Sequence, residues 1–317
     1  MTVSAEGDKL VFNDLNAPIN TSGLDCEPPT AGEVRCTNSG FTALTADLGD
    51  GNDSLRLENS ALATISFASL SGDAGNDTLV AGAATLLLFG GSGNDQLDGS
   101  GNGNGFLAGG SGDDVIQGGP AKDEMRGDDG DDHLSGGAGE DIVKGDEGND
   151  RLDGGPDADA MFGGADVDSL NGDEGPDRLD NPTPAEVADD RSLTDGPDII
   201  SGGTGDDQLG GGLGSGPMQA DRLSGGDGRD TVYYSSRVSP VVVSLDGIPN
   251  YGAIGEGDDV RPDTEDIVGT PGGDTLIGSD AVNFLDGRGG ADVIRGMGGD
   301  DTLQGGVNDP SGDTLIG

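Results

Sequence analysis

The chain has 317 residues, of which 64 are glycine, and its 61 acidic and 15 basic residues give a net charge of −46. Hydrophobic residues make up 31% and aromatic residues 3%, which excludes a conventional core of large apolar side chains. The charge also excludes a surface that attracts nucleic acid or an anionic membrane, and it favours cations as partners. By composition alone, the chain is typical of a disordered protein.

Residues 1–48 precede the repetitive part of the chain and are expected to form an N-terminal β segment. The runs KLVFND, EVRC and FTALTADL predict short strands. The two cysteines, Cys26 and Cys36, lie close together with turn-forming residues between them, which favours a disulfide over two free thiols. A disulfide indicates an oxidising, extracellular compartment.

The sequence predicts a secreted protein, although the start MTVSAEGDKL lacks the apolar core of a signal peptide. Secretion therefore requires either that a signal has been removed or that export uses another route. The most apolar stretch, residues 81–89, is too short to span a membrane.

A nine-residue repeat dominates residues 49–231 and returns in residues 269–317. Numbered from its first glycine, the repeat runs through eight uninterrupted units from Gly109 to Asp180, with aspartate at position six and an aliphatic residue at position eight of every unit. Further units begin at Gly72, Gly90, Gly202 and Gly225. The position-six aspartates of all the units are the candidate metal ligands: Asp77, Asp95, Asp114, Asp123, Asp132, Asp141, Asp150, Asp159, Asp168, Asp177, Asp207, Asp230, Asp274, Asp292 and Asp301.

Three segments interrupt the repeat. Residues 181–193 and 210–220 are predicted loop excursions, and residues 232–268 are predicted to form a β-hairpin-like arm from the segments TVYYSS and PVVVSLD. The run LATISFASL, residues 62–70, is interpreted as a degenerate rung of undetermined register.

The spacing predicts a coil built from two units. The glycines of positions one, two and four suit tight turns, while positions seven to nine form a short strand whose middle residue points inward. Two units close one coil, so unit i lies over unit i+2 and Asp132 over Asp150. Carboxylates stacked in this way repel unless a cation lies between them. Carboxylate and carbonyl oxygens together suit Ca²⁺, whereas zinc would require histidine or cysteine ligands.

The units GGSGNDQLD, GGAGEDIVK and GDEGNDRLD resemble the RTX nonapeptide GGxGxDxUx, which is found in calcium-binding β-helix repeats. The resemblance covers roughly two thirds of the chain. It implies an all-β fold, a parallel β-roll (a right-handed β-solenoid), with several Ca²⁺ ions held between successive turns on each edge. The repeats resemble the hemolysin-type calcium-binding family, and the N-terminal segment and the arm at 232–268 resemble pieces of secreted bacterial RTX proteins.

Some units depart from this pattern. Ala121 and Ala281 occupy position four, where a left-handed conformation is costly for alanine, and Asn283 replaces the aspartate of its unit. The sites of Asp123 and Asn283 are therefore the weakest in the predicted series. Asp157 and Asp166 also occupy position four, but aspartate tolerates that conformation better.

The sequence contains no catalytic constellation, since HExxH, GxSxG and paired Cys and His residues are all lacking. His133 is expected to face solvent, and Tyr233, Tyr234 and Tyr251 are expected to pack within the arm. The favoured function is a secreted, calcium-dependent structural or binding protein with an undefined protein or polysaccharide target. The alternatives are the repeat region of a larger secreted enzyme, toxin or adhesin, and an ice- or polymer-binding surface.

Overall fold

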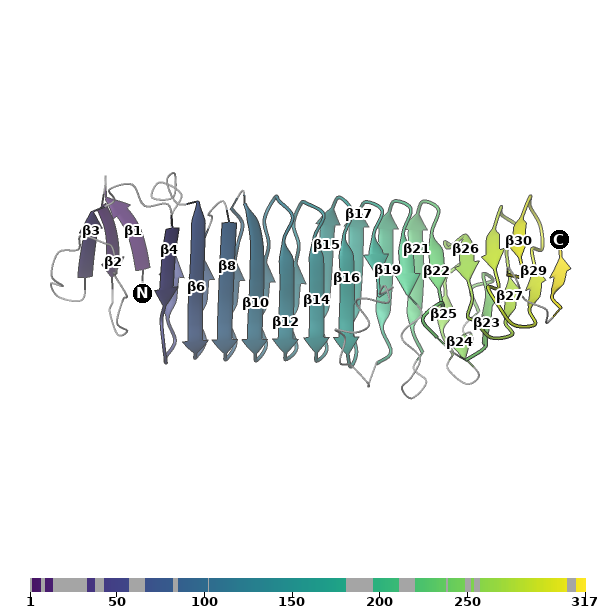
Figure 1. Cartoon of the computed structure of the whole chain (residues 1–317), viewed down its shortest axis with the longest axis horizontal. Coiled ribbons are helices and arrows are strands. Elements are labelled where there is room, and N and C mark those ends of the chain that lie inside the picture. The colour runs from purple at the N-terminus through teal and green to yellow at the C-terminus, as the bar shows by residue number, and fades with distance from the viewer. Residues whose placement is uncertain are drawn as a thin grey trace. The chain divides into compact units, whose positions relative to one another are not determined.

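The computed structural model describes residues 45–56, 66–81, 85–101, 103–180, 196–210, 220–237, 239–248, 252–253, 257–306 and 312–317, together with the strand backbone in 2–6, 9–13, 33–37 and 43–44 (Figure 1). Every regular element in these ranges is a β-strand. The chain divides into two compact units, Met1–Asp150 and Arg151–Gly317, which are described in turn.

The first unit begins with a three-stranded antiparallel sheet of β1 (Thr2–Glu6), β2 (Lys9–Asn13) and β3 (Glu33–Thr37). The strands predicted at KLVFND and EVRC are confirmed, whereas β1 was not predicted. Cys26 lies outside the described residues, as does the side chain of Cys36, so the disulfide stays a prediction.

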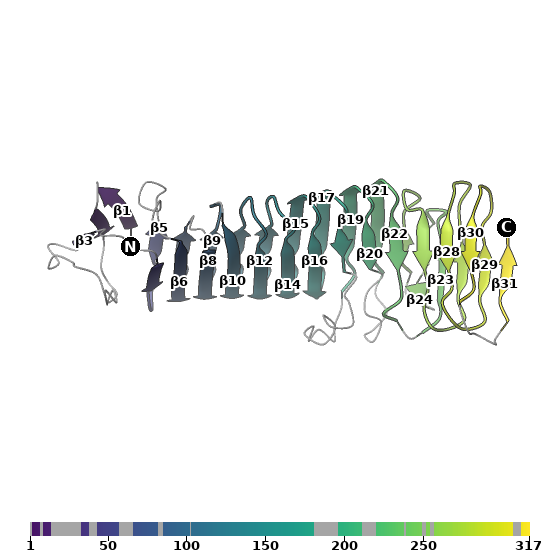
Figure 2. The same ribbon diagram turned by 45° about the horizontal axis from the view of Figure 1, so that its top comes forward.

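The rest of the first unit is a roll with two parallel walls. Wall A contains the even-numbered strands β4 (Ala43–Asp47), β6 (Phe67–Ala74), β8 (Thr85–Ser92), β10 (Asn104–Ser111), β12 (Glu124–Asp129) and β14 (Ile142–Glu147). Wall B contains the odd-numbered strands β5 (Ser54–Arg56), β7 (Thr78–Val80), β9 (Gln96–Asp98), β11 (Val115–Gln117) and β13 (His133–Ser135). The chain alternates between the walls, so each coil contributes one rung to each wall (Figure 2).

The register places each repeat unit over the second one along the chain. Ile116 pairs with Leu134 across β11 and β13, and Met125 pairs with Val143 across β12 and β14. All four side chains are buried, with exposed fractions of 0–1%. Position eight therefore forms the core, as predicted, and His133 beside it is exposed.

The second unit also has two parallel walls, named A and B in the same way, and a third sheet. Its wall A strands are β16 (Ala160–Ala165), β18 (Arg178–Leu179), β20 (Gln208–Gly210), β22 (Thr231–Tyr233), β26 (Asp266–Val268), β28 (Phe284–Asp286) and β30 (Thr302–Gln304). Its wall B strands are β15 (Arg151–Pro156), β17 (Ser169–Glu174), β19 (Ile199–Thr204), β21 (Arg222–Asp227) and β25 (Asp259–Val260). The third sheet consists of β23 (Val241–Ser244), β24 (Gly252–Ala253), β27 (Thr275–Ile277), β29 (Val293–Arg295) and β31 (Thr314–Ile316).

The predicted arm at residues 232–268 is differently built. A hairpin-like antiparallel pair exists, but it joins β23 to β24; the segment TVYYSS is not part of it, because β22 is a parallel rung between β20 and β26. The strands β25 and β26 at the end of this stretch continue wall B and wall A. Thr231–Tyr233 of this segment thus form a rung, because Val232 pairs with Leu209 on one side and with Ile267 on the other.

The structure describes part of the predicted degenerate rung but neither of the predicted loop excursions in full. Residues 62–65 of LATISFASL lie outside the described residues, but the remainder enters β6, where Ala68 pairs with Leu86, and this confirms the degenerate rung and fixes its register. The excursions at 181–193 and 211–219 lie outside the described residues. The domain boundaries predicted from the sequence stay predictions.

Candidate metal centre

Tight turns connect the rungs, and their shape follows from the glycines. In the unit that begins at Gly136, positions two and four are Gly137 and Gly139, with φ of 101° and 126°. Residues with a Cβ rarely adopt this region, so glycine is favoured there. Asp157 and Asp166 take position four with φ of 87° and 74°, which confirms that aspartate can replace glycine at this position.

Each turn ends in its position-six aspartate, and these carboxylates form ladders along both edges of the roll. On the turns that lead into wall B of the first unit, the backbone N–H of Asp114 donates to Oδ1 of Asp132 at 2.7 Å, and that of Asp132 donates to Oδ1 of Asp150 at 2.8 Å. On the turns that lead into wall A, the N–H of Asp123 donates to Oδ1 of Asp141 at 2.7 Å. The predicted pairing of carboxylates two units apart is therefore confirmed within this unit.

The second unit continues the pattern on its own turns. The N–H of Asp159 donates to Asp177 and that of Asp177 to Asp207, both at 2.8 Å, and the N–H of Asp274 donates to Asp292 at 2.7 Å. The predicted pairs 141/159 and 150/168 would join the two units and stay predictions.

The second oxygen of most of these carboxylates is buried without a hydrogen-bond partner. Asp132 is 3% exposed, and its Oδ1 is bonded within the ladder while its Oδ2 is not bonded. A bonded Oδ1 is combined with such an Oδ2 at Asp77, Asp95, Asp114, Asp132, Asp177, Asp207 and Asp230. An unbonded buried carboxylate oxygen is unfavourable, so each one indicates a site for a cation.

The glycine at position one lies beside this oxygen. A Cβ on Gly154 would lie 2.7 Å from Oδ2 of Asp159 and 3.0 Å from the backbone oxygen of Gly172 on the following coil. Glycine therefore leaves a small space lined by a carboxylate oxygen and a carbonyl oxygen. In the described part of the chain, no three carboxylate, histidine or cysteine side chains converge on one point, so a bound ion would need backbone carbonyls to complete its shell. Such an all-oxygen donor set fits Ca²⁺.

Burial changes the protonation of these carboxylates in the metal-free roll. The pKa of Asp132 is raised to about 8, mainly by desolvation; the hydrogen bond from Asp114 N–H opposes this rise, and the neighbouring carboxylates Asp150 and Asp114 add to it. Desolvation is also the main reason why the pKa of Asp114, Asp177 and Asp230 rises to about 7. A cation beside these groups would favour their ionised form.

Three turns satisfy their own position-six oxygen. Oδ2 of Asp123 accepts the N–H of Gly119, Oδ2 of Asp274 accepts the N–H of Thr270, and Oδ1 of Asn283 accepts the N–H of Ser279, each at 2.7 Å. The cost predicted for alanine does not arise, because neither Ala121 nor Ala281 has a positive φ.

The ladders also contain carboxylates that are not among the predicted ligands. In the second unit, the N–H of Asp168 donates to Asp198 and that of Asp198 to Asp221, while the N–H of Asp221 donates to Asp258. Each of these three aspartates lies two residues before a buried aliphatic residue (Ile200, Leu223 and Val260). For Asp198 and Asp221, the nine-residue spacing to Asp207 and Asp230 was a further signal that could have identified them, although only part of the glycine pattern precedes them.

Comparison with known families agrees with this geometry. The sequence matches the family described as RTX calcium-binding nonapeptide repeat (4 copies) over residues 71–104, 99–134, 126–161, 144–179, 193–216, 219–236 and 268–303. These segments cover more than half of the chain, so the fold is a calcium-binding parallel β-roll. The chain belongs to the RTX calcium-binding nonapeptide repeat family. No curated protein matches the sequence. Among the described residues, no helix is long and apolar enough to cross a membrane.

Proposed function

We propose that this protein is a secreted structural or binding module whose β-roll forms only when several Ca²⁺ ions occupy its turns. The observation that carries the proposal is the series of buried Oδ2 atoms, one per turn, each beside the glycine at position one. Seven carboxylates define the series: Asp77, Asp95, Asp114, Asp132, Asp177, Asp207 and Asp230. The same repeat position extends the proposed ligands to Asp141, Asp150, Asp159, Asp168, Asp292 and Asp301. Asp123 and Asp274 are left out because their Oδ2 atoms already accept a hydrogen bond.

Calcium supports folding in this proposal by removing a specific cost. Without a cation, each rung brings a buried carboxylate next to another one in a chain of net charge −46. An ion that binds the folded turn and not the unfolded chain stabilises the roll by mass action. The aspartate side chain would supply a carboxylate oxygen as ligand, and the backbone carbonyls of the adjacent turn would supply the remaining oxygens.

An extracellular location is proposed from the same sites. Turns that each supply one carboxylate together with backbone carbonyls carry little charge per ion, and extracellular calcium modules typically bind with dissociation constants of about 10⁻⁴–10⁻³ M. Such affinities suit a compartment where calcium is abundant.

Isothermal titration calorimetry of the metal-free chain tests this function. We expect several Ca²⁺ ions per chain with a midpoint of about 10⁻⁴–10⁻³ M. Magnesium at the same concentrations is the control and should bind poorly, because it requires tighter octahedral geometry and retains its waters. Equal binding of both ions, or no binding of calcium, would contradict the proposal.

A further inference from the structure

At two places in the second unit, an arginine side chain forms an ion pair with a buried aspartate of the roll: Arg237 with Asp221, and Arg229 with Asp266. In the ladder that leads into wall B, Asp221 and Asp258 are 3% and 0% exposed, and the N–H of Asp221 donates to Oδ1 of Asp258 at 3.1 Å. In contrast to the seven carboxylates described above, both Oδ2 atoms have partners. A guanidinium nitrogen of Arg237 lies 3.9 Å from Oδ2 of Asp221, and the hydroxyl of Tyr234 donates to Oδ2 of Asp258 at 2.9 Å.

Arg237 and Tyr234 form a buried pair of side chains beside Asp221 and Asp258. Arg237 is 4% exposed and Tyr234 is 0% exposed. The guanidinium carbon lies 5.4 Å from the centre of the Tyr234 ring, and the N–H of Arg237 donates to the carbonyl of Tyr234 at 3.0 Å. The N–H of Tyr234 in turn donates to the carbonyl of Val268 at 2.8 Å, which connects this pair of residues to β26 of wall A. A buried arginine requires compensating anions, and the ladder supplies them.

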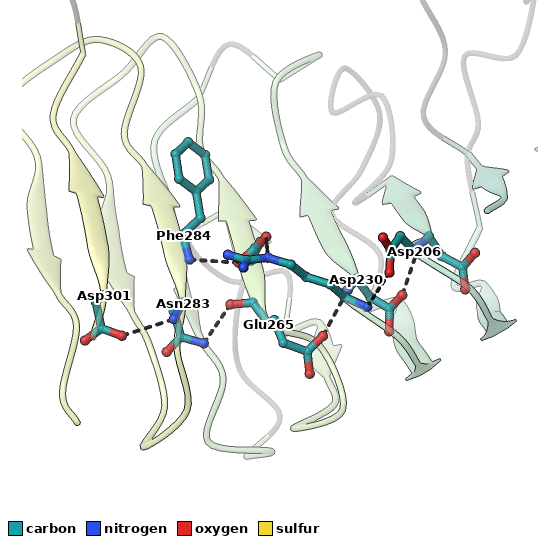
Figure 3. A network of polar contacts seen from close by, with 9 residues as sticks. Asp206, Asp230, Glu265, Asn283, Phe284 and Asp301 are labelled. Carbon is teal, nitrogen blue, oxygen red and sulfur yellow. Dashed lines mark hydrogen bonds and ion pairs between the residues drawn. The ribbon is translucent and has the colours of Figure 1, made fainter. Parts of the chain in front are cut away.

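A second arginine lies on the turns that lead into wall A at the same stretch of sequence. Arg229 forms a bidentate ion pair with Asp266, with nitrogen–oxygen distances of 2.8 and 3.0 Å. Beside it, Glu265 takes the place of an aspartate and accepts the N–H of Asp230 at 2.9 Å. Figure 3 shows these contacts: Asp206 accepts the N–H of Arg229, Glu265 accepts the N–H of Asp230, and Asn283 donates to the carbonyl of Glu265 and to Asp301. Here the repeated aspartate is replaced where a side-chain cation lies nearby.

We infer that Arg237, aided by Tyr234, replaces a calcium ion in the ladder at Asp221 and Asp258, so that residues 221–237 and 258–268 form a nucleus within the roll that stays ordered without calcium, while the turn of Asp230 keeps its own proposed calcium site. This inference rests on the proposed function, because it presupposes that the other rungs require calcium. A guanidinium beside Asp221 repels a divalent cation, and a hydroxyl proton on Asp258 occupies the oxygen that a metal would use. The nucleus therefore gives the neighbouring turns an ordered coil on which they fold when calcium arrives.

Hydrogen–deuterium exchange of the full chain in excess chelator tests the inference directly, since exchange reports local unfolding. Peptides from 221–237 and 258–268 should exchange at least about tenfold more slowly than peptides from 109–135, which corresponds to about 1.4 kcal/mol of local stability. Equally fast exchange in all these peptides would overturn the inference and leave the proposed function standing. Protection of all of them in chelator would instead overturn the proposed function.

The variant Arg237→Gln distinguishes the role inferred for Arg237 from the calcium dependence of the other turns, because it is also tested by counting bound ions. It removes the cation but keeps a polar side chain, so it should abolish the protection in chelator and raise the number of bound Ca²⁺ ions, measured by native mass spectrometry, by one. Arg151→Gln is the matched control: it removes the same charge from an exposed ion pair with Asp153 and should change neither quantity. Tyr234→Phe removes the hydrogen bond to Asp258 but leaves the charge of Arg237, so it should reduce the protection from exchange less than Arg237→Gln does. If R237Q bound no additional ion and kept its protection, the inference would be wrong whatever the rest of the roll required.

Discussion

At the scale of the residue, the position-six aspartate has two tasks, one for each oxygen. Oδ1 links successive coils by accepting a backbone N–H, as between Asp114 and Asp132 at 2.7 Å, and Oδ2 remains buried for a cation. The first task is performed equally well by asparagine, because an amide oxygen also accepts a hydrogen bond. The second task requires the negative charge.

Asp132→Asn therefore separates the two tasks. The variant should keep the backbone link but lose a carboxylate ligand, so we expect fewer bound Ca²⁺ ions and a calcium midpoint about tenfold higher, equivalent to about 1.4 kcal/mol. Calorimetric titration measures both. Asp131→Asn is the control, because Asp131 is exposed and its Oδ1 accepts the N–H of Asn149 at 2.9 Å, which an asparagine would also do. An equal effect of both variants would show that overall charge, and not the ladder position, determines binding.

The raised pKa of these carboxylates predicts how the metal-free chain responds to acid. Burial raises the pKa of Asp132 to about 8 and of Asp114 to about 7 from an unperturbed 3.8. Their protonation therefore stabilises the metal-free roll fully below about pH 4, and this contribution is lost as the pH rises through about 7 to 8. In chelator, circular dichroism should show more β-structure at pH 5 than at pH 7.5. A β-signal that stays constant or falls on acidification would contradict this assignment.

At the scale of the element, each three-residue strand contributes one buried side chain and depends on its neighbours for the rest. In β13, Leu134 is 0% exposed and pairs with Ile116 of β11, while the flanking residues of the strand face outward. A rung of this kind cannot be stable in isolation, so cooperativity between coils is expected.

Leu134→Ala should destabilise the calcium-bound roll by about 2–5 kcal/mol, because it leaves a cavity in a core only one side chain wide. Chemical denaturation in saturating calcium measures this change. Val115→Ala is the control, since Val115 is 47% exposed and its truncation should stay within about 0.5 kcal/mol. A similar loss in both variants would mean that the apolar face has been assigned to the wrong side of the strand.

The sequence predicted the rungs because their period is set by local chemistry: Asp132 and Leu134 recur with the glycines that their turn requires. It did not predict Asp198, Asp221 or Asp258 as ladder members, because each follows an interruption of the repeat and keeps only part of the glycine pattern before the spacing to Ile200, Leu223 or Val260. The role of Arg237 is set by its contact with Asp221, which lies sixteen positions earlier in the sequence, and no periodic signal encodes this contact. The same reason explains why β22 was assigned to a hairpin and is instead a rung.

At the scale of the whole molecule, the balance is between many small gains and one large electrostatic cost. Each coil buries few apolar atoms, and ordering nine residues costs about 9–18 kcal/mol in backbone entropy. The net charge of −46 adds repulsion throughout the chain. Backbone hydrogen bonds offset part of this cost, and bound cations supply the remainder.

Far-ultraviolet circular dichroism of the full chain at pH 7.5, in excess chelator and after addition of calcium, tests this central claim most directly. The account predicts a spectrum dominated by disorder in chelator, with residual β-structure confined to the second unit, and a cooperative gain of β-structure on adding Ca²⁺ that Mg²⁺ does not reproduce. The same β-spectrum in a verified metal-free sample and in calcium would contradict it.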